Sequence, residues 1–152
     1  MDLSKLKLGQ KIVLGAGILL IINLFLPWWR VDFGLGSASA NAFDEFLAWF
    51  GSFCAIAAAV IIALKVFGNM KINAGPLKAE HLALALSALG FLFILIEMLI
   101  ENDFMFVGIW IGLIASAVLV YGAFLCMKQE GYAIQDFKSL GGGNTPPPPP
   151  PA

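Results

Sequence analysis

Four long apolar segments constrain this chain more than any other feature of its sequence. They cover about residues 12–29, 48–67, 81–100 and 104–127. At about 1.5 Å per residue, helices of this length measure roughly 27 to 36 Å, close to the ~30 Å thickness of a bilayer's hydrocarbon core. Lipid offers no partners to backbone polar groups, so each segment is expected to be helical. We therefore predict an all-α membrane protein, an antiparallel bundle of four transmembrane helices.

The composition agrees with a membrane protein. Hydrophobic residues make up 60 % of the chain and charged residues 12 %, whereas soluble domains average about 45–50 % and about 25 %. Nine Lys and Arg residues against ten Asp and Glu residues leave no basic excess, so nucleic acid is not an expected partner. Runs such as FLFILI lack the alternation that a transmembrane β-barrel requires.

Basic residues flank the apolar segments mainly on one side. Arg30 lies on the other side, and the remaining eight are Lys5, Lys7, Lys11, Lys65, Lys71, Lys78, Lys128 and Lys138. The positive-inside rule predicts a multi-pass protein of the cytoplasmic (inner) membrane with both termini inside. The first apolar stretch is longer than that of a signal peptide, so we expect it not to be cleaved.

The chain divides into a transmembrane domain at 1–130 and a cytoplasmic tail at 131–152. The tail contains Gly141 to Gly143 and six prolines, Pro146 to Pro151. Such a run forms polyproline II structure without internal hydrogen bonds. We predict a solvated spacer or disordered tail, with a recognition tail as the alternative.

The connection between the first two segments is the longest. Gly34, Gly36, Ser37 and Ser39 predict a flexible first half. Asn41 is then the expected N-cap of a helical turn that leads into the second segment.

Six aromatic residues near the outer ends of the first two segments are predicted to form an interfacial belt at headgroup depth. A docking surface for a partner is the alternative. They are Trp28, Trp29, Phe43, Phe46, Trp49 and Phe50.

Glu97 is the main candidate for a functional polar residue. It belongs to a stripe with spacings of 4, 3, 4, 3 and 4 residues: Ala83, Ser87, Gly90, Ile94, Glu97 and Glu101. The small members of a stripe face neighbouring helices, so Glu97 is expected to face the bundle interior. Ionisable residues at membrane depth are usually paired or functional. We predict a structural ion pair between Glu97 and Arg30, with a proton or substrate site as the alternative.

Small residues also repeat at four-residue spacing in the last segment, at Gly108, Gly112 and Ser116. Such a stripe lets two helix backbones approach closely. Packing within the bundle is the prediction, and homodimerisation is the alternative.

No residue pattern predicts a catalytic, cofactor or metal site. Cys54 and Cys126 differ in depth by roughly 24 Å, which is too far for a disulfide. The lone His81 is expected to be a polar residue at a helix end. HExxH, GxSxG and phosphate-binding glycine motifs are all missing from the sequence, so we do not expect an enzyme.

The sequence resembles a group of small four-helix integral membrane proteins of actinobacterial type. The resemblance lies in the start GQKIVLGAGILL, the exit Phe25-Leu-Pro-Trp-Trp29, the loop from Ser37 to Glu45, which is similar to SxSANAWxxF, and the proline-rich end. It implies the four-helix architecture and no particular activity.

These observations lead to one expected function and one alternative. The expected function is a non-catalytic interaction or scaffold subunit embedded in the lipid bilayer, bound to another membrane protein or to further copies of itself. The alternative is a small oligomeric transporter or channel subunit that uses Glu97.

Overall fold

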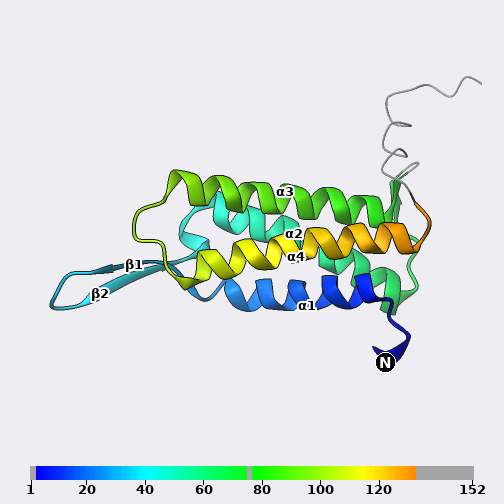
Figure 1. Cartoon of the computed structure of the whole chain (residues 1–152), viewed down its shortest axis with the longest axis horizontal. Coiled ribbons are helices and arrows are strands. Elements are labelled where there is room, and N and C mark those ends of the chain that lie inside the picture. Colours follow the sequence, from blue (N-terminus) through cyan, green and yellow to red (C-terminus); the bar gives the residue numbers. More distant parts are fainter. Residues whose placement is uncertain (1–2, 75–76, 133–152) are drawn as a thin grey trace, which may run out of the picture.

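The computed structural model describes residues 3–74 and 77–132. Within these ranges the chain forms four α-helices that lie side by side (Figure 1): α1 (Leu8–Asn23), α2 (Phe46–Gly68), α3 (Ala79–Ile100) and α4 (Val107–Gln129). Helices α1 and α3 each pack on both α2 and α4. The predicted four-helix architecture is therefore observed. All of the predicted tail beyond residue 132, including its prolines and Lys138, lies outside the described residues.

Short elements connect the helices. Two 3₁₀ helices, η1 (Leu3–Lys5) and η2 (Ala42–Asp44), precede α1 and α2. As predicted, the side chain of Asn41 caps a helical turn, because its Oδ1 accepts a hydrogen bond from Phe43 N at 2.9 Å. Strands β3 (Asn73–Ala74) and β4 (Leu77–Lys78) pair between α2 and α3.

Helix α1 begins and ends earlier than the predicted 12–29 segment. Its start is stabilised by Gln10, whose side-chain Oε1 accepts a hydrogen bond from Lys7 N at 3.0 Å. Its end follows from Pro27, because the residue before a proline avoids the helical conformation and proline has no N–H to donate. The 16 residues of α1 measure about 24 Å.

The segment after α1 forms a β-hairpin. Strands β1 (Pro27–Asp32) and β2 (Ser37–Asn41) pair antiparallel and project beyond the bundle along its long axis (Figure 1). Gly34 has φ +77° in the tight turn, a conformation that favours glycine. The prediction of a flexible loop is wrong here, because the backbone of the serine-rich stretch pairs with β1.

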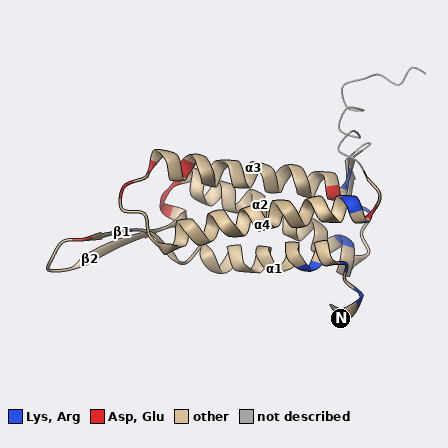
Figure 2. Cartoon of the chain, viewed as in Figure 1, with Lys and Arg blue, Asp and Glu red and all other residues tan. Residues whose placement is uncertain are grey.

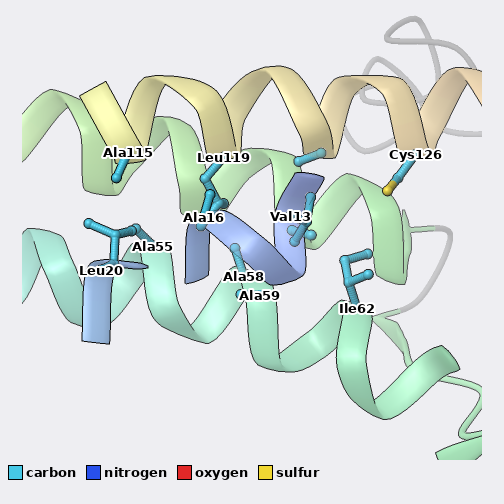
Figure 3. Close-up of a cluster of buried hydrophobic side chains, with 12 residues drawn as sticks. Val13, Ala16, Leu20, Ala55, Ala58, Ala59, Ile62, Ala115, Leu119 and Cys126 are labelled. Atoms are coloured by element: carbon cyan, nitrogen blue, oxygen red, sulfur yellow. The ribbon is translucent and has the colours of Figure 1, made fainter. Parts of the chain in front are cut away.

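The interior is rich in small residues, and many large apolar residues cover the outside. Figure 3 shows side chains of α1, α2 and α4 meeting in a core rich in alanine. Ile18, Leu99 and Ile114 are more than 60 % exposed on the outer surface. A soluble bundle would present polar residues there, whereas small residues between helices are typical of membrane proteins. Helices α2, α3 and α4 are long and apolar enough to cross a membrane, and α1 is apolar but shorter.

Charged residues gather at the two ends of the bundle (Figure 2). We call the end where α1 and α3 begin the lysine end. The opposite end, which carries β1 and β2, is the hairpin end, and its acidic residues include Asp44, Glu45, Glu97, Glu101 and Asp103.

Candidate functional site

Glu97 lies on the buried face of α3, one turn before the helix ends, and is 3 % exposed. Ala83, Ser87, Gly90 and Ile94 of the same stripe are also buried, whereas Glu101 is exposed. Gly90 allows α2 to approach this face, because a Cβ at Gly90 would lie 2.5 Å from the carbonyl oxygen of Gly51. The stripe therefore packs inside the bundle as far as Glu97.

The predicted ion pair between Arg30 and Glu97 is not formed. Arg30 Nε lies 3.4 Å from Asp32 Oδ1 instead, and its side chain is 42 % exposed. The Oε1 atom of Glu97 is buried without a hydrogen-bond partner among the described residues. The prediction failed because it placed Arg30 at the end of a helix. An irregularity in the strand between Pro27 and Trp29 places both Trp28 and Trp29 against the protein, whereas Arg30, the next residue along β1, is exposed and faces away.

A cavity of about 310 Å³ lies at the hairpin end, beside the end of α3. Its lining includes the carboxylates of Glu45, Glu101 and Asp103 and the ring of Trp29. Glu101 is the C-cap of α3 and follows Glu97 by one helical turn, so the two carboxyl groups lie at the same end of the helix. However, in residues 3–74 and 77–132 no group of three His, Cys, Asp or Glu side chains is arranged to hold a metal ion. The hairpin end thus has an acidic surface, and the buried carboxyl group of Glu97 lies one helical turn further into the bundle.

The small-residue stripe of α4 packs within the chain, against Trp28. A Cβ at Gly108 would lie 2.5 Å from Trp28 Cδ1, and a Cβ at Gly112 would lie 2.9 Å from Trp28 Cζ2. Trp28 is fully buried, and its Nε1 donates a hydrogen bond to the carbonyl oxygen of Asn23 at 3.0 Å. Ser116 is also buried, and its hydroxyl donates to the carbonyl oxygen of Leu113. Trp28 fills the space beside Gly108 and Gly112. A second copy of the chain therefore cannot pack against these two glycines.

The aromatic residues therefore divide into two groups. Trp28 and Trp29 are 0 % and 8 % exposed, so their predicted place in an interfacial belt is wrong, because β1 turns them into the core. The other four surround the start of α2, where Phe43 and Phe46 are exposed and Phe46 contacts the rings of Trp49 and Phe50 at 5.3 and 5.4 Å. That position agrees with a belt at the hairpin end.

Sequence reasoning missed the tip of the hairpin. Phe33 and Leu35 lie at the turn and are 69 % and 105 % exposed. The base of the hairpin is held by Arg30 N, which donates to Phe104 O at 3.0 Å, and by Phe106 N, which donates to Trp28 O at 2.7 Å. The alternation Arg30-Val-Asp32, with Gly34-Leu-Gly36 after Phe33, was the signal that could have revealed this strand and turn.

Sequence reasoning also missed a chain of ion pairs at the lysine end. Lys7 Nζ lies 2.8 Å from Glu130 Oε1, and Lys65 Nζ lies 3.6 Å from Glu130 Oε2. Lys65 also pairs with Glu80, which is 2 % exposed. The hydrogen bond from Lys7, together with the charge of Lys65, lowers the pKa of Glu130. These four residues connect the lysine ends of all four helices.

Cys54, Cys126 and His81 are the remaining candidates from the sequence. Cys54 and Cys126 are both free, as predicted. His81 lies in the first turn of α3, at a helix end as predicted; it is 1 % exposed, and its ring lies 5.6 Å from that of Tyr132.

No family model, curated protein or solved structure matches this chain. The resemblance to small actinobacterial membrane proteins stays a prediction.

Proposed function

We propose that this chain is a multi-pass protein of the cytoplasmic membrane that acts as a non-catalytic interaction or scaffold subunit. In this proposal all four helices cross the bilayer, both termini lie in the cytoplasm and the β1–β2 hairpin lies outside. The hairpin is the observation that carries the proposal.

The packing of α1 supports a fourth crossing. A Cβ at Gly9 would lie 2.7 Å from the backbone of Cys126, and a Cβ at Gly112 would lie 2.7 Å from the side chain of Asn23. Helix α1 therefore accompanies α4 from one end of the bundle toward the other. Its outer face carries exposed Ile18 and Ile22, as a lipid-facing surface would. The lysines at one end of the bundle support the orientation.

The hairpin has the properties of an interaction element. Its base is held by backbone hydrogen bonds to the α3–α4 connection and by the buried Trp28 and Trp29. Its tip exposes Phe33 and Leu35 beyond the end of the helices (Figure 1). Exposed apolar groups on a well-held projection favour contact with another protein. Because the hairpin points along the helix axes, we expect that partner to lie outside the bilayer.

Photocrosslinking from the hairpin tip tests this function. A photoreactive residue at Leu35 should give an adduct of discrete mass with a protein in the native membrane. The matched position is Ile114 on α4, which is 61 % exposed and in this proposal faces lipid. Leu35→Ser, combined with the photoreactive residue at Phe33, should weaken the adduct. If position 35 yields no protein adduct, or the same adducts as position 114, the proposal is wrong.

A second candidate is a small oligomeric transporter or channel subunit that uses Glu97. The buried carboxyl group without a hydrogen-bond partner among the described residues favours it. Its test is proton flux in liposomes containing the purified chain, compared with the Glu97→Gln variant. Flux that disappears in the variant would support transport, and equal flux would exclude this role for Glu97.

A further inference from the structure

A second cavity, of about 420 Å³, lies at the lysine end between the end of α2 and the start of α3. The polar side chains in its lining are Lys65, Lys71, Lys78, Glu80, Asn69 and Tyr132. It is separate from the hairpin and from Glu97, which lie at the opposite end of the bundle.

The lysines of this cavity differ in their partners. Lys65 is neutralised by its ion pairs with Glu80 and Glu130. Lys71 and Lys78 form no ion pair within residues 3–74 and 77–132. Among the described residues, two lysines without an ion pair therefore line the cavity, and the acidic residue in that lining, Glu80, is paired with Lys65.

The backbone adds to this positive field. Helix α3 begins at Ala79, which lines the cavity, and its N-cap residue, Lys78, forms no side-chain cap hydrogen bond. The first N–H groups of a helix carry a partial positive charge and favour anions. The helix terminus and the side chains of Lys71 and Lys78 thus both favour an anion in the cavity.

The position of the cavity indicates which anion it meets. Helix α2 ends at Gly68 and α3 begins at Ala79, so the cavity lies where two apolar helices leave the hydrocarbon region. Its lining also includes the apolar side chains of Met70 and Ile72. Lysines beside apolar groups at this depth match an anionic lipid, whose phosphate lies next to its acyl chains.

We propose that this cavity binds the phosphate headgroup of an anionic phospholipid, with Lys71 and Lys78 as the cationic contacts. The proposal rests on the bilayer embedding proposed above, and it is independent of the hairpin's role as an interaction element.

Native mass spectrometry of the full chain in detergent, titrated with phosphatidylglycerol, tests this site. The test variant is Lys71→Gln/Lys78→Gln. The control variant is Lys11→Gln/Lys128→Gln, which removes two exposed lysines of the same end outside the cavity. We expect the apparent Kd for phosphatidylglycerol to rise about 10- to 30-fold in the test variant, since each lysine contributes a contact. It should change less than about twofold in the control, because neither Lys11 nor Lys128 lines the cavity and exposed charges without a direct contact contribute little.

Other outcomes would overturn the proposal. An equal loss in both variants would mean general charge attraction, and no loss in the test variant would exclude this cavity. Displacement of the lipid by millimolar inorganic phosphate would mean that the site takes a free anion. If the double variant does not fold, Lys71→Gln alone, in an exposed connection, should still weaken binding about fivefold. The amount of each variant in the membrane fraction is measured as well. A variant that stays in the membrane but binds the lipid weakly has lost the site, whereas a variant missing from the membrane has lost its embedding in the bilayer.

Discussion

The indole ring of Trp28 lies over Gly112, where a Cβ would come within 2.9 Å of Trp28 Cζ2. This contact joins the hairpin end of α4 to the start of β1. It also explains why Trp28 is fully buried although it follows the end of a helix.

Gly112→Ala tests this contact. The new methyl group would collide with Asn23 and Trp28, so the variant should lose about 1–3 kcal/mol of stability through overpacking. Gly15→Ala is the matched control, because a Cβ at Gly15 in α1 meets nothing within 4 Å, and alanine favours the helix. Thermal unfolding in detergent measures both. Equal melting temperatures, or a change of oligomeric state with Gly112→Ala alone, would contradict packing within one chain.

The environment of Glu97 leads to a second prediction. Arg30 pairs with Asp32 rather than with Glu97, so Glu97→Gln breaks no ion pair within the part of the chain that the structure describes. Burying an unpaired charge is costly, and the variant should therefore not lower the melting temperature. Combined with Arg30→Gln, its effect should be additive within about 0.5 kcal/mol. A lower melting temperature for each single variant that is partly recovered in the double variant would mean that the two residues interact.

The ion pairs of Glu130 predict a pH dependence. Because Lys7 and Lys65 lower the pKa of Glu130 in the folded chain, its carboxylate stabilises the fold above the unfolded pKa of about 4.3. This contribution is lost as the pH falls through the lower folded pKa. Glu130→Gln should therefore be less stable than the wild type at pH 7, by roughly 1 kcal/mol for a partly exposed network, and equally stable below that range. As a control, Asp103→Asn at the opposite end removes a carboxylate that forms no ion pair within the described residues, and it should change the stability at pH 7 by less than about 0.5 kcal/mol.

The proposed orientation can be tested with reporter fusions. A fusion after Lys138 should report the cytoplasm, and a fusion within the hairpin turn, between Gly34 and Ser39, should report the outer side. Lys5→Gln/Lys7→Gln should leave the orientation unchanged, because lysines at the other connections also specify it. An outer signal from the fusion after Lys138 would exclude the proposed topology.

The sequence by itself determined the four helices and the inward face of α3. Apolar length and the spacing of small residues are local properties, and Ala83, Ser87, Gly90 and Ile94 lie inside as their periodicity predicts. The lack of a disulfide also followed from helix length alone. Local patterns suffice in these cases because each helix forms its own backbone hydrogen bonds.

Only the tertiary structure decided which side chains meet. Lys7 and Glu130 are 123 residues apart, and no local pattern pairs them. Pro27 ends α1, but the direction of Trp28 and Arg30 depended on whether a helix or a strand followed. The serine-rich strand β2 has little β propensity of its own, and it forms because β1, which is itself held to the α3–α4 connection, offers partners to its backbone. The pairing of β1 with β2 and the ion pair between Lys7 and Glu130 join segments that are separated in sequence. Their stability therefore depends on packing between segments, which no single segment's sequence determines.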